Sequence, residues 1–152
     1  TGGEPMLQQE ELQPLVKSMA AEGYTFEVET NGTIPPTTGM LRHIGQWNVS
    51  PKLRTSGNQL LETQNPLALQ TFAALPDAYF KFVIAVESDV DEVCTLRDQY
   101  DLAPQRILLM PEGRTLDALA RKSAWLPELC VQHGFRFTTR LHIILWGDER
   151  GR

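Results

Sequence analysis

The sequence predicts an α/β protein whose sheet is largely parallel. Along the chain, segments with apolar residues at helical spacing alternate with short segments rich in β-branched and aromatic residues. The most strand-like segment, residues 79–86, is a continuous apolar run, which is typical of a parallel strand buried on both faces. At 152 residues the chain has the length of one domain with one core, and we expect residues 1–152 to form a single domain.

The first half of the chain predicts two strands among helices and loops. Apolar spacing predicts a helix over about residues 10–22, with Glu11 as its N-cap, Pro14 in its first turn and Gly23 at its end. Residues 24–30 alternate and are rich in β-branched and aromatic types, so they predict a strand. The other expected elements are a loop with a short helical piece over 34–46, a short buried strand over 47–49, a mobile polar loop over 53–65, and a helix over 66–74 that starts at Pro66.

The second half continues the alternation. Residues that favour helix ends mark its helices: Ser88 or Asp89 as the N-cap of one, Thr115 as the N-cap of the next, and Gly134 as the end of the latter. The expected elements are a strand over 79–86, a helix over about 90–100, a strand over 106–110, a long helix from Thr115 to about His133, and a last strand over about 135–146.

The composition is that of an ordinary globular protein, with 41% hydrophobic and 22% charged residues. A net charge of −5 gives no overall positive field for a nucleic acid or an anionic membrane surface. No apolar run approaches the roughly 20 residues that span a bilayer, and there is no secretory signal pattern. We therefore expect neither a nucleic-acid partner nor a membrane partner.

The two cysteines, Cys94 and Cys130, are far apart, and each falls inside a helical pattern. We interpret them as buried thiols in a reducing cytoplasm, which is the expected location of the protein. Without a Cys-x-x-Cys pair or a close Cys/His group, the sequence offers no metal site.

The opening residues, Thr1-Gly2-Gly3-Glu4-Pro5, predict a tight turn that can approach a ligand. The two glycines have no Cβ to block a close approach, and the Glu4 carboxylate can face a cation. Pro5 suits the start of the next segment, where a missing N–H costs little. Taken alone, the same five residues are equally compatible with a strand-to-helix turn that exposes a glutamate.

Polar residues recur where the predicted strands end. In parallel α/β folds, ligands bind at the carboxyl ends of the strands, so we expect a bound ligand at this edge. The clusters are Thr1 to Glu4, Glu29 with Asn31, Ser50-Pro51-Lys52, and Met110-Pro111-Glu112-Gly113.

The residue types indicate what the ligand contains. Glu4 can accept hydrogen bonds from an ammonium, and Lys52 can meet a carboxylate beside the Ser50 hydroxyl. Gly113 lets the backbone approach a flat base or a ribose. An ammonium, a carboxylate and a nucleoside together describe S-adenosylmethionine. For each residue taken singly, a solvated loop residue is the alternative.

Arg140 and His142 are two positions apart in the last predicted strand and would share one of its faces. Two cationic or near-cationic groups on one face can receive an anionic substrate. A purely structural histidine is the alternative for His142.

Taken together, these motifs resemble a known family. The opening turn resembles the Gly-Gly-Glu-Pro motif of radical S-adenosylmethionine enzymes. The later motifs resemble those of the 7-carboxy-7-deazaguanine synthases of queuosine biosynthesis and follow in the same order, over essentially the whole chain. They are Glu29-Thr30-Asn31-Gly32-Thr33, Val49-Ser50-Pro51-Lys52, Lys81-Phe82-Val83, Met110-Pro111-Glu112-Gly113 and Arg140-Leu141-His142.

The resemblance implies a fragment of a partial, TIM-like (β/α) barrel from a homodimeric carbon–nitrogen lyase. Such an enzyme converts 6-carboxytetrahydropterin into 7-carboxy-7-deazaguanine with loss of ammonia, in the 7-deazapurine pathway of tRNA modification. A reduced [4Fe–4S] cluster cleaves S-adenosylmethionine to a radical that abstracts hydrogen from the pterin, and Mg²⁺ assists. A reducing donor such as flavodoxin is the implied electron source.

By motif position, the resemblance also implies site residues, although it assigns no catalytic residue. The substrate-binding residues would be Thr1, Glu29 and His142. The cofactor-binding residues would be Gly2, Gly3 and Glu4 at the methionine amino end, Ser50, Pro51 and Lys52 at its polar groups, and Met110, Pro111, Glu112 and Gly113 at the adenosine side.

The sequence departs from the family pattern because the Cys-x3-Cys-x2-Cys loop and the magnesium ligand are absent. The chain starts at Thr1 and no strand feeds its opening turn, so we expect the C-terminal portion of a longer barrel, inactive by itself. The missing leading strands would leave the strand at Glu27–Thr30, or its neighbour, as an unpaired edge that is prone to association.

Two alternatives from other classes are considered. One is a cluster-free module that binds a nucleotide or S-adenosylmethionine without chemistry. The other is a radical enzyme that activates a protein glycyl radical, but the Ser50-Pro51-Lys52 and Arg140-Leu141-His142 motifs argue against it.

Overall fold

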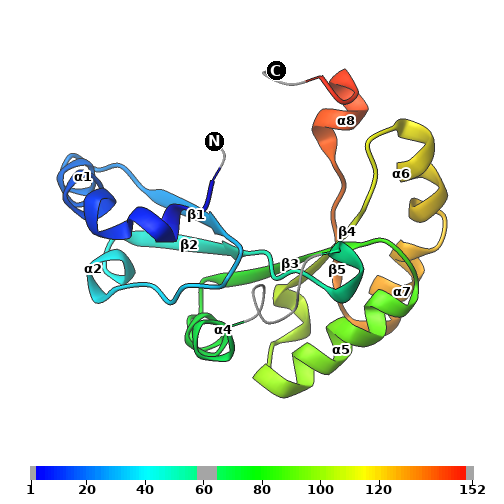
Figure 1. Cartoon of the computed structure of the whole chain (residues 1–152), viewed down its shortest axis with the longest axis horizontal. Helices are drawn as coiled ribbons and strands as arrows, with labels where there is room; N and C mark the ends of the chain where they lie inside the picture. Colours follow the sequence, from blue (N-terminus) through cyan, green and yellow to red (C-terminus); the bar gives the residue numbers. More distant parts are fainter. Residues whose placement is uncertain (1–2, 58–64, 150–152) are drawn as a thin grey trace. The chain divides into compact units, whose positions relative to one another are not determined.

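The protein forms a five-stranded sheet flanked by helices (Figure 1). The structure is a computed structural model, and it describes residues 3–57 and 65–149. The strand order is β1-β2-β3-β4-β5, and the β1–β2, β2–β3 and β4–β5 pairs are parallel. The predicted α/β class with parallel strands is therefore confirmed. The strand β1 stands at one end of this order, whereas the association expected at that edge stays a prediction.

The chain divides into two compact units, and β3 contributes residues to both. The first unit contains the described residues of Thr1–Lys52 and Asn58–Phe80. The second contains those of Leu53–Gly57 and Lys81–Arg152. The expectation of a single domain stays a prediction.

The core of the first unit lies between the strands and the helix α4. Val28 of β1 and Val49 of β2 are buried, and the Trp47 ring lies 5.4 Å from the Phe72 ring, centroid to centroid. These side chains alternate along β1 and β2, as expected for strands with one buried face. The elements of this unit are η1 (Pro5–Gln8), α1 (Gln9–Ala21), β1 (Phe26–Thr30), α2 (Thr38–Leu41), β2 (Ile44–Val49), α4 (Pro66–Ala73) and the beginning of β3 (Ala78–Ile84).

Most expectations for the first unit are confirmed within two or three residues, but the start of the first helix is wrong. The 3-10 turn η1 leads directly into α1 at Gln9, so Glu11 lies inside the helix rather than capping it. Pro14 likewise lies in the helix interior, where its ring removes one backbone hydrogen bond. The part of the expected mobile loop at 58–64 lies outside the described residues.

The core of the second unit surrounds β3 and β4. Phe82 and Ile84 of β3 and Ile107 and Leu109 of β4 are each at most 1% exposed. The longest described helices, α1 and α5, have 13 residues each, and none of the helices in the described ranges is long and apolar enough to cross a bilayer. The elements of this unit are η2 (Arg54–Ser56), the remainder of β3, α5 (Ser88–Tyr100), η3 (Pro104–Arg106), β4 (Ile107–Pro111), α6 (Leu116–Ser123), α7 (Leu126–His133), β5 (Arg136–Phe137) and α8 (Leu141–Trp146).

Two expectations about helix boundaries in the second unit are wrong. The N-cap of α5 is Glu87, and Ser88 and Asp89 lie in the first turn. The long helix expected from Thr115 to His133 is two helices, because Pro127 has no N–H to continue the hydrogen-bond pattern of α6. Thr115 caps α6 as predicted, and Gly134 ends α7 with a left-handed φ of 70°.

The expectation of a last strand over 135–146 is also wrong. Only Arg136 and Phe137 pair with β4, opposite Leu108 and Leu109. The apolar run that follows forms α8, in which Ile143 is buried while its neighbours in the run are exposed. A short continuous apolar run does not by itself distinguish a strand from a helix, and here the run is helical.

The packing of α4 on β2 leads to a prediction about stability. Phe72→Ala is expected to lower the free energy of unfolding by about 3–5 kcal/mol, because the ring is fully buried against Trp47. Urea denaturation measures the change. Leu67→Ala in the same helix is the control, since Leu67 is 65% exposed and its truncation is expected to cost about 0.5 kcal/mol or less. Equal effects of the two substitutions would contradict the described packing.

Candidate functional site

The opening turn and the end of β1 meet at the carboxylate of Glu4. Its Oε1 atom accepts hydrogen bonds from the Met6 backbone N–H at 3.2 Å and the Thr30 hydroxyl at 2.7 Å. Its Oε2 atom accepts from the Asn31 backbone N–H at 2.7 Å. Gly3 has a φ of +79°, which favours glycine at this position of the turn. The glutamate of the predicted motif turn is therefore tied to the adjacent strand end.

The hydrogen bonds continue from β1 towards α4. The Asn31 side-chain oxygen accepts from the Thr33 N–H at 2.9 Å and from the Thr33 hydroxyl at 2.7 Å. The Asn65 side-chain amide donates to the Thr33 carbonyl at 2.9 Å, and the Asn65 side-chain oxygen caps α4. We call Glu4, Thr30, Asn31, Thr33 and Asn65 the β1-end network.

Gly32 has no room for a side chain inside this network. Its φ is +76°, and an added Cβ would lie 2.7 Å from Val49 Cγ1. The glycine in the Glu29–Thr33 motif is therefore required by packing against β2 as well as by backbone conformation.

The Ser50-Pro51-Lys52 segment follows β2 at the same edge of the first unit. The Ser50 N–H donates to the Thr30 carbonyl at 2.7 Å, which places the segment directly beside the end of β1. Pro51 is buried, Ser50 and Lys52 are half-buried, and Glu29 is exposed on β1. The structure thus brings Glu4 and Ser50 beside the same residue, Thr30, at the end of β1. Thr1 and Gly2 lie outside the described residues.

In the second unit, the Met110–Gly113 segment ends β4 beside α6. The Glu112 N–H donates to the Ile84 carbonyl at 2.9 Å. Lys122 Nζ donates to Glu112 Oε2 at 2.6 Å and to the Glu112 carbonyl at 2.8 Å. The hydrogen bond from Lys122 is the main cause that lowers the pKa of Glu112, and the charges of Arg140 and Arg114 add to it.

Gly113 is buried and packs against α6. An added Cβ would lie 3.1 Å from both Ala118 Cβ and Leu119 Cδ2. The absence of a side chain at this position therefore serves helix packing, which the sequence-based argument about a ligand did not include.

Arg140 and His142 do not share a strand face. Arg140 is the N-cap of α8, and His142 is exposed in the first turn of that helix. The prediction of two cationic groups on one strand face is wrong, because residues two apart on a helix point in different directions. Among the described residues, the buried Nε of Arg140 has no hydrogen-bond acceptor.

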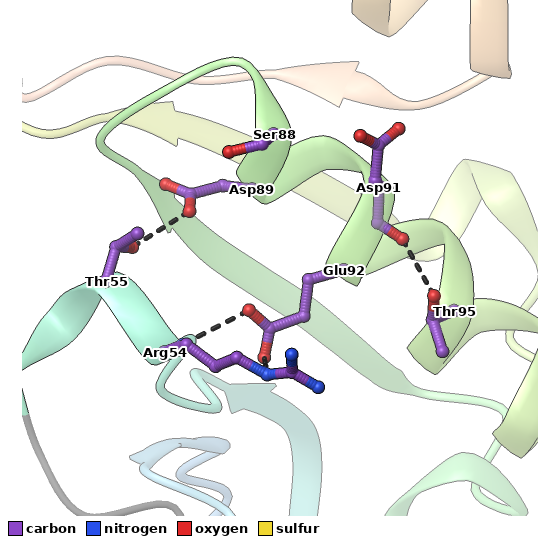
Figure 2. A pocket seen from close by; sticks show the side chains of 7 residues that line it. All are labelled: Arg54, Thr55, Ser88, Asp89, Asp91, Glu92 and Thr95. Atoms are coloured by element: carbon purple, nitrogen blue, oxygen red, sulfur yellow. Dashed lines mark hydrogen bonds and ion pairs between the residues drawn. The ribbon is translucent and has the colours of Figure 1, made fainter.

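A cleft of about 380 Å³ lies between η2 and α5 (Figure 2). Asp89, which is 2% exposed, accepts from the Thr55 hydroxyl at 2.9 Å and from the N–H groups of Ala85 and Val86 at 2.7 and 3.1 Å. Glu92 accepts from the Arg54 N–H at 3.2 Å. Two carboxylates of α5 therefore hold the turn that follows Lys52 in the chain. Asp89 was one of the two residues predicted as the N-cap of this helix, but its bond to Thr55 joins residues 34 positions apart in the sequence.

A second cleft, of about 330 Å³, lies between the end of β3 and α6. Its lining includes the apolar Val86 and Trp125, the acidic Glu87, and the cations Arg121 and Lys122. Both cations also have carboxylate partners, Asp117 for Arg121 and Glu112 for Lys122. These pairs reduce the charge available to an anionic ligand there.

Neither cysteine is part of a metal site in the described chain. Cys94 lies on α5 with its Sγ 3.6 Å from His133 Nδ1, and Cys130 lies on α7. Burial raises the pKa of both thiols, that of Cys130 to about 11. Across residues 3–57 and 65–149, no group of three or more His, Cys, Asp or Glu side chains can hold a metal ion.

Comparison with known proteins finds several relatives that all carry the same protein name. A 7-carboxy-7-deazaguanine synthase from Pyrobaculum aerophilum is 36% identical over 153 residues, which cover 100% of this chain and 66% of that protein. The synthase of the same name from Halobacterium salinarum is 34% identical over 97% of this chain and 64% of its own length. That from Hyperthermus butylicus is 30% identical over 95% of this chain and 63% of its own length.

The chain belongs to the 7-carboxy-7-deazaguanine synthase family. It spans slightly less than two thirds of the length of these relatives. No protein-family model matches it. The family predicted from the ordered motifs is therefore confirmed.

For this member of the synthase family, the predicted site residues fall into two sets. The first unit brings Glu4 and Ser50 together at the ends of β1 and β2, and the second unit places Glu112 and Gly113 at the end of β4. The expectation that Glu4, Lys52 and Gly113 line one common pocket stays a prediction.

The contacts of Glu112 lead to a prediction about pH. Because Lys122 lowers the pKa of Glu112, its stabilising contribution is present above the unfolded-state pKa of about 4.3 and is lost as the pH falls through the lower folded-state pKa. Lys122→Met is expected to raise the Glu112 pKa towards its ordinary value in an NMR titration. Arg121→Met is the control, because Arg121 pairs with Asp117 instead. An unchanged Glu112 titration in the Lys122 variant would contradict the assigned cause.

The contacts of Asp89 lead to a prediction about the turn η2. Asp89→Asn is expected to lower the free energy of unfolding by about 2–3 kcal/mol, because hydrogen bonds to a buried carboxylate are lost, and Thr55→Val by about 1 kcal/mol. Chemical denaturation measures both changes. The exposed neighbour Asp91 gives the matched control, since Asp91→Asn is expected to cost less than about 1 kcal/mol. A wild-type midpoint for the Asp89 variant would refute the anchoring role.

Proposed function

We propose that this chain supplies the cofactor- and substrate-binding loops of a 7-carboxy-7-deazaguanine synthase of the radical S-adenosylmethionine superfamily. The complete enzyme converts 6-carboxytetrahydropterin into 7-carboxy-7-deazaguanine and releases ammonia, as a carbon–nitrogen lyase of 7-deazapurine biosynthesis. The observation that carries the proposal is the position of the motifs in a chain of this family. Asn31 follows β1, Ser50 follows β2 and Glu112 closes β4, so the motif residues stand at carboxyl ends of parallel strands.

Each binding role follows from the chemistry of the residue. The turn at Gly3 and Glu4 receives the methionine amino group of S-adenosylmethionine. The Ser50 hydroxyl and the Lys52 ammonium receive polar groups of the same molecule. Met110 to Gly113 lie against its adenosine side. We assign no catalytic residue.

For the pterin, the proposal keeps the three substrate residues implied by the family. Glu29 is exposed on β1, and His142 is exposed on α8. Thr1 completes the set and lies outside the described residues. A homodimer, a reducing electron donor such as flavodoxin and a cytoplasmic location belong to the same proposal.

The residues of this chain do not fit the iron–sulfur cluster that the reaction class requires. Three thiolates hold such a cluster, whereas the sequence has two cysteines, on α5 and α7, and burial disfavours the thiolate form of both. No step of the reaction is therefore assigned to a cluster bound by these 152 residues. Among the described residues, no group of three or more His, Cys, Asp or Glu side chains could hold a metal ion.

A second candidate function is a module that binds S-adenosylmethionine or a nucleotide without chemistry. The number of cysteines supports it, because the two cysteines of these 152 residues are fewer than the three thiolates that hold a cluster. The strand-end motifs serve binding equally well in either case.

The proposal predicts binding without cleavage. By calorimetry, the 152-residue chain is expected to bind S-adenosylhomocysteine, and Lys52→Ala is expected to weaken the binding. Anaerobic incubation with S-adenosylmethionine and dithionite is expected to give no 5′-deoxyadenosine by chromatography, because the cluster ligands are not among these residues. Cleavage by this chain would refute its predicted inactivity, and failure to bind would refute the assigned ligand.

A further experiment distinguishes the two candidate functions. The coding sequence immediately upstream of the codon for Thr1 is read and, where it continues in frame, expressed with the chain. Three cysteines in that segment and restored cleavage support the synthase. A start codon directly before the codon for Thr1 supports the binding module.

A further inference from the structure

We propose that the exposed apolar side of the helix α8 (Leu141–Trp146) is a docking surface inside the complete family polypeptide (Figure 1). The occupant is the part of that polypeptide that has no counterpart in these 152 residues. The proposal concerns an interaction surface and goes beyond the proposed function. It is tested without a ligand, so the failure of S-adenosylmethionine binding would not decide it.

The helix α8 is apolar on nearly every side, yet it buries a single side chain. All of its residues except His142 are large and apolar. Ile143 is 1% exposed. The other four apolar side chains are between 46% and 60% exposed, and they are Leu141, Ile144, Leu145 and Trp146. Because a helix that is hydrophobic all round is normally buried all round, most of α8 lacks the partner that its sequence requires.

Three of the exposed side chains form one stripe. Leu141, Ile144 and Leu145 stand at positions i, i+3 and i+4, which lie on the same face of a helix. Ile143 follows Leu141 by two positions, so the buried side chain is about 200° of helix rotation away from the first residue of the stripe. The stripe therefore faces away from the packed side of α8. We call Leu141, Ile144 and Leu145 the α8 stripe.

The helix that carries the α8 stripe is an ordered part of the second unit. At its start, the Ile143 N–H donates to the Arg140 carbonyl at 3.0 Å. At its end, the Gly147 N–H donates to the Ile143 carbonyl at 3.0 Å. The Arg114 guanidinium lies 3.8 Å from Asp148 Oδ2 and so joins the residue after Gly147 to the loop before α6. These contacts present the stripe as a formed helical surface.

The size of α8 favours an occupant from the same polypeptide. A stable interface between separate chains takes about 20–30 residues on each side, because association removes translational and rotational freedom. The helix α8 has 6 residues. A tethered segment is already held at a high effective concentration, so a small apolar surface is enough to retain it. A second copy of this chain is therefore the less suitable occupant.

The length of the relatives supplies such a segment. Each of the three relatives named above has about a third of its length that this chain does not span. We call the corresponding part of this protein the remaining third. In the proposal, the remaining third contributes a helix or strand face with aliphatic side chains, and this face covers the α8 stripe.

The experiment compares two proteins by amide hydrogen exchange. One is the 152-residue chain, and the other is the same chain expressed with all codons that continue in frame beyond its ends. Over residues 141–146 we expect exchange in the extended protein to be about tenfold slower or more, because complete burial of three half-exposed aliphatic side chains shifts an opening equilibrium by at least that factor. Leu145→Ser in the extended protein is expected to raise exchange there about threefold or more.

Val131→Ser is the matched control. Val131 is an aliphatic residue on the helix α7 of the same unit and is 83% exposed. This substitution is expected to leave the exchange of α8 within about twofold in both proteins, because Val131 lies outside the α8 stripe. In the 152-residue chain, Leu145→Ser is expected to keep the wild-type urea midpoint, since Leu145 is 54% exposed there.

Several outcomes would overturn the proposal. Equal exchange of α8 in the two proteins would mean that nothing docks on the stripe, and so would a reading frame that does not extend beyond these 152 residues. Slow exchange already in the monomeric 152-residue chain would mean that its own residues cover the stripe. Protection that rises with the concentration of the 152-residue chain would identify a second copy as the occupant. Unchanged exchange in Leu145→Ser would place the contact elsewhere.

Discussion

The structure depends on satisfying the backbone donors at the carboxyl ends of its parallel strands. A strand that ends inside a protein leaves N–H groups without a ladder partner, and leaving such a group unpaired costs free energy. In the first unit, the Glu4 carboxylate accepts a hydrogen bond from the Asn31 backbone N–H. It also accepts one from the Thr30 hydroxyl. These hydrogen bonds therefore join the opening turn to the end of β1, and they determine where the motif residues of both segments lie.

The second unit satisfies the same demand with different residues. Asp89 accepts from two N–H groups directly after β3, and the Glu112 N–H after β4 donates to the Ile84 carbonyl. Asp89 also accepts a hydrogen bond from the Thr55 hydroxyl (Figure 2). The same carboxylate therefore binds the backbone after β3 and holds the turn η2. Carboxylates at strand ends thus accept hydrogen bonds both from the backbone after a strand and from residues of neighbouring loops.

The sequence predicted the elements best where a single residue imposes a local constraint. Proline at Pro66 and the left-handed glycine at Gly134 determine helix ends without help from distant residues. The prediction failed over 135–146, because an apolar run has no period that distinguishes a strand from a helix, and β5 has only two paired positions on β4. At the candidate site, the sequence identified Glu4 and Ser50 as strand-end residues. The bond between Glu4 and Thr30 was not predictable, since it joins residues 26 positions apart.

Gly113 has a consequence for how such motifs are interpreted in other chains. An added Cβ would lie 3.1 Å from side-chain atoms of Ala118 and Leu119, so a larger residue would require these neighbours on α6 to shift by a few tenths of an ångström, whether or not any small molecule is bound. The close packing against α6 favours a glycine here independently of any ligand. A glycine in this motif can therefore be explained by helix packing alone. Evidence for a ligand has to come from the hydrogen-bonding residues around it.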